Sequence, residues 1–308
     1  LVDAMVSGVF AGDSRQLELA SAFPKMADME ARYGGLVKAM VALKRQRRAS
    51  GGSTSGPAGP GGRLTCFNEG FETLPRALHA HLRNEVRLGM EITAIERTPG
   101  GYSVLTASGD SFGADAVVLA CPARNAAPSV ATLSPELSAE MAAIAYSSIA
   151  VLSLAFRASE LSRIPDGFGF LVPRGQGPRI LGCLWSSSIF RHRAPPGSVL
   201  LHVMTGGAQD EAAVSLSDDA LIETALADLK LIMNISASAQ FARIFRYAHG
   251  IAQYQPGHQA RLARMGVLLE GLSGLFISGS SYGGISVNHC VEEAPRVAAK
   301  VMSFLEER

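Results

Sequence analysis

The apolar positions early in the chain repeat at intervals of three or four residues, which is the spacing of a helix that buries one face. This spacing predicts an amphipathic helix over residues 30 to 46 and a second helix after residue 70. The positions that carry the two predictions are Met29, Tyr33, Leu36, Val37, Met40 and Leu43, and then Leu74, Ala77, Leu78 and Leu82. The first helix ends in basic residues from Lys44 to Arg48, which suit the negative end of a helix dipole.

Between these two helices lies a stretch with almost no apolar side chains. Ala49 to Gly62 reads ASGGSTSGPAGPGG and contains nothing larger than Ala or Pro among its apolar residues. Such a segment cannot bury enough surface to offset the entropy lost on ordering. We therefore expect a mobile loop here.

Period-two patterning then replaces the helical spacing. Strands are predicted at residues 91 to 97, 102 to 107 and 114 to 120, separated by the turn signals Pro99-Gly100-Gly101 and Ser108-Gly109-Asp110. The pattern predicts a β-meander whose last strand is fully apolar.

The second half alternates helical and strand patterns without a repeat period. The expected helices are residues 123 to 130, 135 to 143, 218 to 233, 257 to 269 and 292 to 305. The expected strands are residues 147 to 156, 168 to 172, 179 to 185, 198 to 205, 241 to 247 and 275 to 279.

Composition narrows the class of protein. The 308 residues are 47% hydrophobic and 18% charged, which supports a sizeable core, and 28 Lys and Arg balance 27 Asp and Glu to a net charge of +1. Such a chain has no overall field to attract nucleic acid, so a small molecule is the expected partner. No stretch approaches the roughly 20 apolar residues that cross a bilayer, and we expect a cytoplasmic protein.

The cysteines indicate a reducing compartment. Cys66, Cys121, Cys183 and Cys290 are far apart in the sequence and form no CxxC pair. We expect free, buried thiols and neither a structural zinc site nor a disulfide framework.

One glycine-rich segment is a candidate ligand site. Gly274 to Gly284 places an apolar strand directly before a run of small residues, and a helix is expected to begin near Val291. Backbone amides in such a loop can approach an anionic or polar ligand, aided by the positive end of the following helix. Taken alone, a glycine-rich turn is just as compatible with a purely structural role.

Five segments in order resemble the protoporphyrinogen oxidases, FAD-dependent flavoproteins of the amine oxidase type. The opening SGVFAGDSRQLELASAFPKMADMEARYGGL is similar to a GVYAGD-like turn followed by an AFP element and a Glu-containing helix. The other four are CFNEGFETLPRAL from Cys66, in which Glu69 replaces a family glycine, the LWSSSIF and APPG elements, IAQYQPGH from Ile251, and ISGSSYGGISVNHC from Ile277.

The resemblance implies a mixed α/β and α+β fold, with an incomplete Rossmann-like FAD-binding domain interleaved with a substrate domain built on an antiparallel sheet. Residues 1 to 60 would form a helical segment with the flexible loop. Residues 61 to 145 and 249 to 308 would belong to the FAD domain, and residues 146 to 248 would form the substrate-binding domain.

The same resemblance implies the flavin contacts. Ile92 would lie against the adenine half of FAD, and Ala120 and Pro122, in the turn that ends at Ala123, near the pyrophosphate. From the residues alone, that turn is equally an ordinary strand end. The remaining expected contacts come from the closing loop, at Gly279, Ser280, Ile285, Ser286 and Val287. Ser280 stands where relatives often carry Asn or Asp, and Asn288-His289-Cys290 where many read Pro-Asp-Cys.

For the substrate, the resemblance implies a flat tetrapyrrole held by Leu171 and Phe190, which by pattern alone are equally core residues. The implied reaction is the oxidation of protoporphyrinogen IX to protoporphyrin IX, with dioxygen as the second partner and FAD as cofactor. We assign no catalytic acid or base, and we expect His258 to be structural. A homodimer and a peripheral membrane association through an upstream region stay open.

No G-x-G-x-x-G string occurs in the chain, although a dinucleotide site requires one. We therefore expect the C-terminal part of such an oxidase, which on its own neither retains FAD nor oxidises a porphyrinogen. The alternatives are oxidation of coproporphyrinogen III, an amine-oxidase-type flavoprotein with another substrate, and a non-catalytic remnant.

Overall fold

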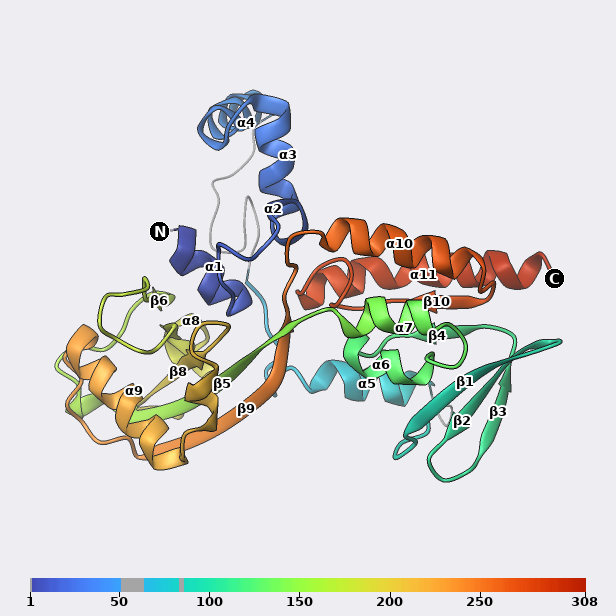
Figure 1. Ribbon diagram of the computed structural model, residues 1–308. Helices are drawn as coiled ribbons and strands as arrows, with labels where there is room; N and C mark the ends of the chain where they lie inside the picture. Colours follow the sequence, from blue (N-terminus) through green and yellow to red (C-terminus); the bar gives the residue numbers. More distant parts are fainter. Residues whose placement is uncertain (1, 51–63, 83–85) are drawn as a thin grey trace. The chain divides into compact units, whose positions relative to one another are not determined.

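The computed structural model describes residues 2–50, 64–82 and 86–308 (Figure 1). The loop predicted over residues 49 to 62 lies outside this part of the chain, except for Ala49 and Ser50. These two residues end a helix instead, in keeping with the high helix propensity of alanine.

The described chain forms two compact units. The larger unit comprises Leu1–Glu18 and Asp115–Arg308, and the smaller one comprises Leu19–Ala114. Their boundaries differ from those expected for the FAD and substrate domains, which are defined by the ligand that each would bind. The division into those two domains stays a prediction.

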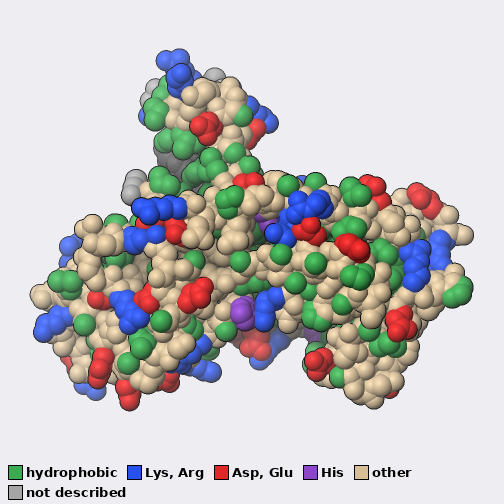
Figure 2. Space-filling view, viewed as in Figure 1, with side chains coloured by type: hydrophobic (Ala, Val, Ile, Leu, Met, Phe, Trp, Pro, Cys, Tyr) green, Lys and Arg blue, Asp and Glu red, His purple; other side chains and the backbone are tan. Residues whose placement is uncertain are grey.

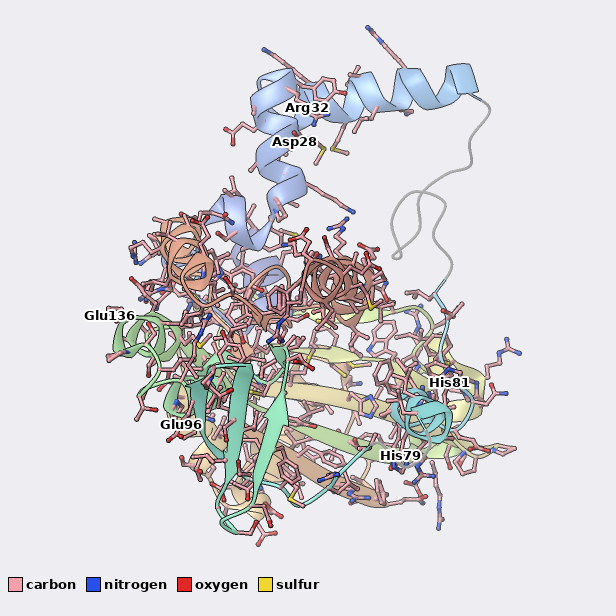
Figure 3. The ribbon with its side chains drawn as sticks, turned by 90° about the vertical axis from the view of Figure 1, so that its right-hand side faces the viewer. Asp28, Arg32, His79, His81, Glu96 and Glu136 are labelled. Atoms are coloured by element: carbon pink, nitrogen blue, oxygen red, sulfur yellow. The ribbon has the colours of Figure 1, made fainter. Side chains whose placement is uncertain are left out.

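The smaller unit begins with helices. They are α2 (Leu19–Ala22), α3 (Pro24–Tyr33), α4 (Leu36–Ser50) and α5 (Thr73–Leu82). The single helix expected over residues 30 to 46 is wrong, because Gly34 and Gly35 take φ values of 71° and 148° and end α3 before α4 starts. Figure 3 shows Asp28 and Arg32 one turn apart on α3, where their charged groups approach to 2.6 Å.

The smaller unit also contains the predicted meander. Strands β1 (Ile92–Thr98), β2 (Gly101–Thr106) and β3 (Ser111–Ala114) pair antiparallel in that order, and the turns fall where Gly100-Gly101 and Gly109 predict them. The apolar third strand expected over residues 114 to 120 is wrong. That run divides at Asp115, and Val117–Leu119 forms β4, which pairs in the larger unit.

A five-stranded antiparallel sheet dominates one end of the larger unit. Its order is β6-β7-β8-β5-β9. The strands are β5 (Tyr146–Arg157), β6 (Gly169–Leu171), β7 (Gly182–Leu184), β8 (Ser198–Gly206) and β9 (Phe241–Ala252), with the short helix α8 (Ser186–Ile189) between β7 and β8. The strand predicted at residues 241 to 247 is therefore longer than expected, because it stays paired with β5 past a bulge.

Helix α9 (Asp218–Met233) covers one face of this sheet (Figure 1). Its bounds are those predicted from the sequence, because Ser217 caps its first turn and Asn234 ends it in the left-handed conformation. Leu221, Ala225 and Leu229 lie in the core beneath it. The strand residues in the same core are Ala150, Leu152, Leu154, Phe156, Cys183, Val199, Leu201 and Val203.

The segment that follows helix α1 (Val2–Phe10), at Ala11, packs closely against the loop after β8, and this close packing is called here the tight corner. The helix ends at Ala11, which takes a φ of 47°. The Ala11 carbonyl accepts a hydrogen bond of 2.7 Å from the amide of Ala208, in the loop after β8. A Cβ on Gly207 would lie 2.7 Å from that same carbonyl, so this close approach requires glycine.

The other end of the larger unit is an α/β arrangement. Strands β4 and β10 (Leu275–Ile277) form a parallel pair. The surrounding helices are α6 (Ala123–Ser129), α7 (Pro135–Ala142), α10 (His258–Glu270) and α11 (Val287–Glu306). Helix α11 begins earlier than the predicted residue 292, because Ser286 caps it.

The described chain contains the expected mixture of parallel and antiparallel sheet with helices. Of the four cysteines only Cys183 is buried, with a thiol pKa raised to about 12 by burial, while Cys121 is exposed. In the described ranges we find no helix that is both long and apolar enough to cross a membrane. Basic and acidic side chains are interspersed on the face seen in Figure 2.

Candidate functional site

The parallel pair β4–β10 brings two distant loops to the same edge. Val117, Val118 and Leu119 pair in register with Leu275, Phe276 and Ile277, so both strands end side by side. The pairing continues past the strands, since the Ser278 amide donates to the Leu119 carbonyl at 3.0 Å. Ligands in α/β sheets bind at such carboxyl ends. The turn at residues 120–123 and the loop at residues 278–286 therefore form a candidate site, called here the β4–β10 cradle.

Ser281 joins the two halves of the cradle. Its side chain is 1% exposed, and its Oγ accepts a hydrogen bond of 3.0 Å from the Ala123 amide. The same oxygen lies 2.8 Å from the hydroxyl of Tyr146, the first residue of β5. One buried hydroxyl thus fixes the turn, the loop and the start of the long strand relative to one another.

Two aromatic side chains also contact the backbone of the loop. Tyr254 donates from its hydroxyl to the Ser280 carbonyl at 2.6 Å, and His258 Nε2 lies 3.4 Å from the Tyr282 carbonyl. Because a carbonyl only accepts, His258 carries its proton on Nε2. Burial raises the pKa of Tyr254 well above its usual range and lowers the pKa of His258, so both side chains are neutral at pH 7.

Helix α11 begins directly after the loop, so its N-terminal end, with its free backbone amides, lies at the cradle. Ser286 is its cap residue and accepts a hydrogen bond of 3.1 Å from the His289 amide. The His289 ring covers two glycines of the loop, since a Cβ on Gly283 or Gly284 would lie 2.8 Å or 2.6 Å from it. The positive end of a long helix and a side-chain-free backbone suit an anionic or polar ligand.

One polar atom of the loop has no partner within the described residues. The Tyr282 hydroxyl is buried and makes no hydrogen bond there, although a buried hydroxyl normally has one. Burial also raises the pKa of Tyr282. Gly279, with a φ of 114°, and the small residues around it leave the backbone accessible. These features fit a large polar ligand, such as a dinucleotide, at the cradle.

A profile of proteins described as flavin containing amine oxidoreductase matches residues 1–302. The chain belongs to this family. The expectation of an amine-oxidase-like flavoprotein with FAD as cofactor is therefore confirmed, and so is the expected fold class.

The chain is similar to the coproporphyrinogen III oxidase of Bacillus subtilis, with 27% identity over 99% of the chain and 64% of the relative. It is 29% identical to the chloroplastic protoporphyrinogen oxidase 1 of Arabidopsis thaliana, over 99% of the chain and 60% of that protein. It is 28% identical to the protoporphyrinogen oxidase of Bos taurus, over 98% of the chain and 65% of that protein. The chain thus spans less than two thirds of the length of these relatives.

Solved structures share the fold. A protein from Exiguobacterium, provisionally assigned as a protoporphyrinogen oxidase, superposes with a TM-score of 0.79 at 25% identity, over 99% of the chain and 63% of its own. Cyclohexylamine oxidase from Brevibacterium oxydans superposes with a TM-score of 0.68 at 14% identity, over 99% of the chain and 64% of its own. The second likeness concerns the fold alone.

Of the expected flavin contacts, most meet at the cradle. Ala120 and Pro122 lie in the turn after β4, and Gly279 lies across from them, where a Cβ would be 3.4 Å from the Ala120 carbonyl. Ser280 follows in the loop, and Ile285, Ser286 and Val287 lead into α11. Ile92 is the first residue of β1 in the smaller unit and is 40% exposed. Its contact with the adenine stays a prediction.

The two expected substrate residues lie in the larger unit near the five-stranded sheet. Leu171 is the last residue of β6, is 39% exposed and packs on Gly8 of α1. Phe190 follows α8, is half-buried, and has its ring centroid 6.0 Å from that of His192. Their role in binding substrate stays a prediction.

From the sequence a structural role is expected for His258, in agreement with its buried position beside the Tyr282 carbonyl, but the roles of Tyr254, Ser281 and Tyr146 are not expected. Tyr254 and His258 lie in the IAQYQPGH segment, and His258 is the first residue of α10. They are four residues apart in the sequence, and this spacing is a signal that could have indicated a paired role. Ser281 lies between expected contacts without any signal of its own. Tyr146 carries no signal either, because its partner is 135 residues away in the sequence.

Proposed function

We propose that this chain is part of an FAD-dependent oxidase that converts a porphyrinogen to the corresponding porphyrin. Protoporphyrinogen IX is the first candidate substrate, in keeping with the names of the plant and mammalian relatives. Coproporphyrinogen III is the second, and the Bacillus subtilis relative favours it.

The observation that carries the proposal is the β4–β10 cradle. Its backbone at Ala120, Pro122, Gly279 and Ser280, together with the start of α11 at Ile285 to Val287, would hold the flavin. A bound flavin would supply the redox chemistry, as acceptor of hydride from the substrate and donor of electrons to dioxygen. The residues of this chain supply position and electrostatics for that chemistry.

Within the cradle, each buried side chain has a definable task. Ser281 keeps the turn and the loop at a fixed separation through its bonds to Ala123 and Tyr146. Tyr254 and His258 fix the orientation of the loop carbonyls and therefore of the amides between them. We assign no acid or base to the chain.

The porphyrinogen would lie on the larger unit with Leu171 and Phe190 among its apolar contacts. We further propose a cytoplasmic location, with peripheral membrane association and a homodimer as open properties of the intact protein.

Two preparations test the proposal. The purified 308-residue chain should elute from gel filtration without the flavin absorbance at about 450 nm. Protein translated from the complete reading frame should retain FAD and consume dioxygen with protoporphyrinogen IX or coproporphyrinogen III. The ratio of kcat/KM values for the two substrates identifies the preferred one. A flavin-loaded protein that oxidises an amine and neither porphyrinogen would refute the substrate assignment.

A further inference from the structure

One face of the five-stranded sheet is covered by α9, and the opposite face, called here the open face, is only partly covered, by α1 at Leu171 and by α8 at His202. The covered face packs against α9 and contains the core. Residues that pair directly across antiparallel strands point to the same face, so the register defines the other one. On β9 that open face carries Phe241, Phe245 and Tyr247, which are 51%, 38% and 51% exposed. Edge strands normally avoid exposing such aromatic side chains, which indicates a surface that binds something.

The side chains on the open face form rows that run across the strands, because residues paired in register lie next to one another. One apolar row runs from Leu171 on β6 to Phe245 on β9, by way of Gly182, Met204 and Val151. Another apolar row consists of Leu200, Ala155 and Phe241. Between them lies a row that is polar over three adjacent strands, with His202 on β8, Ser153 on β5 and Arg243 on β9. Leu171, an expected substrate contact, therefore shares this face with a basic stripe.

His202 is held in place by a neighbour. Its Nδ1 lies 2.5 Å from the Oγ of Ser186, which is 8% exposed at the start of α8. With Nδ1 occupied, Nε2 is the ring atom left to meet a ligand. Burial lowers the pKa of His202, and the nearby Arg193 guanidinium lowers it further. An arriving anion would offset both effects.

Arg243 is likewise oriented on the face. Its guanidinium lies over the Phe245 ring at 5.0 Å from the centroid, and the side chain is exposed. Two strand spacings separate β8 from β9, which is about 10 Å. Ser153, between them on β5, is 8% exposed, so a negative group bound across this row would meet His202 and Arg243 rather than Ser153. None of the residues in the three described rows is acidic.

We propose that His202 and Arg243 form a carboxylate-binding stripe that anchors a propionate of the porphyrinogen while the flanking apolar rows receive its tetrapyrrole. The inference rests on the proposed function for the identity of the ligand. Coproporphyrinogen carries propionates where protoporphyrinogen carries vinyl groups. Because protoporphyrinogen keeps its other propionates, the stripe can anchor either substrate, and coproporphyrinogen offers it more carboxylates.

Direct binding to the 308-residue chain tests the stripe without flavin. The stable oxidised products, coproporphyrin III and protoporphyrin IX, serve as fluorescent probes. A second pair of probes, pyrenebutyrate and its uncharged analogue pyrenebutanol, tests the anion site independently of porphyrins. The variants are Arg243→Gln, at an exposed position, and His202→Asn, which keeps a partner for Ser186. Arg163→Gln removes one exposed charge from the same unit and is the matched control.

We expect each stripe variant to weaken binding of coproporphyrin III and pyrenebutyrate by roughly tenfold, as for loss of one charged hydrogen bond. Pyrenebutanol binding and the Arg163→Gln variant should change less than about twofold. Binding of pyrenebutyrate through the stripe without any porphyrin binding would support the site and count against the porphyrinogen function. Porphyrin binding that is indifferent to both substitutions would overturn the stripe alone. No binding of pyrenebutyrate by the wild-type chain would also overturn it.

Discussion

Tyr254 and His258 stack with their ring centroids 4.3 Å apart and their planes inclined by 16°, and each meets a different carbonyl of the same loop. Tyr254 binds the carbonyl of Ser280 and His258 that of Tyr282. The pair therefore fixes two alternate peptide units of the cradle, which sets the direction of the amides between them.

Removing the Tyr254 hydroxyl should destabilise the larger unit. In Tyr254→Phe, the Ser280 carbonyl loses its donor, and the free energy of unfolding should fall by about 1–3 kcal/mol. Urea denaturation followed by circular dichroism measures the loss. The matched control is Tyr247→Phe on β9, whose side chain is 51% exposed and whose loss should cost less than about 0.5 kcal/mol. Equal effects of the two substitutions would show that the Tyr254 bond does not hold the loop.

His258 should make stability depend on pH. Its pKa in the folded chain is below the ordinary value of 6.5, mainly because of burial. The unfolded chain then binds more protons, so the stabilisation is complete above pH 6.5 and is lost as the pH falls from 6.5 to the folded pKa. In His258→Asn, the fall in unfolding free energy over this range should be shallower than in wild type.

The control for this profile is His249→Asn, which replaces an exposed histidine near the end of β9. Its unfolding free energy, measured at the same pH values, shows what the loss of an exposed histidine does on its own. A His258→Asn protein with the wild-type slope would show that His258 is not the group responsible.

Ser281 should link the stability of the turn at residues 120–123 to that of strand β5. In Ser281→Ala, the buried Ala123 amide loses its acceptor, which should cost about 1–3 kcal/mol. A double-mutant cycle with Tyr146→Phe should give an interaction energy of about 1 kcal/mol, because the two hydroxyls are bonded directly. Strict additivity of the two substitutions would mean that no such coupling exists.

Gly207 should tolerate no side chain. Its φ is 83°, and a Cβ at this position would lie 2.7 Å from the Ala11 carbonyl, so Gly207→Ala should cost at least about 1–3 kcal/mol. Gly266→Ala is the control, because Gly266 lies within α10 with open space around it and should gain about 0.5–1 kcal/mol. Thermal unfolding of both variants distinguishes the two outcomes. A stable Gly207→Ala protein would contradict the tight corner at Ala11.

Local signals predict most elements of the fold. The bounds of helix α9 follow from the sequence because Ser217 and Asn234 are strong caps. The break at Gly34 and Gly35 escapes the same reasoning, because apolar spacing continues across two residues whose backbone does not stay helical. The run before Ala120 has the pattern of one strand, although Asp115 divides it between two sheets. That division depends on pairing with β10, more than 150 residues later in the chain, which no local pattern reports.

The candidate site divides in the same way. Small residues after apolar strands predict the glycine loop and the turn at Ala120, and the structure brings the two together. The side chains that hold them are not predictable, because Ser281 and Tyr254 act through single hydrogen bonds to distant partners. The expectation of buried thiols is wrong at Cys121, since the turn that places it at the cradle also exposes it.

The most direct test of the cradle is flavin retention by protein translated from the complete reading frame, with and without Gly279→Val. At a φ of 114° valine is strained, and its side chain would point toward the Ala120 carbonyl where the flavin is proposed to pass. We predict that the wild-type protein elutes with bound FAD and that the variant elutes folded, by circular dichroism, without it. Equal FAD content in the two proteins, or none in the wild type, would contradict the account.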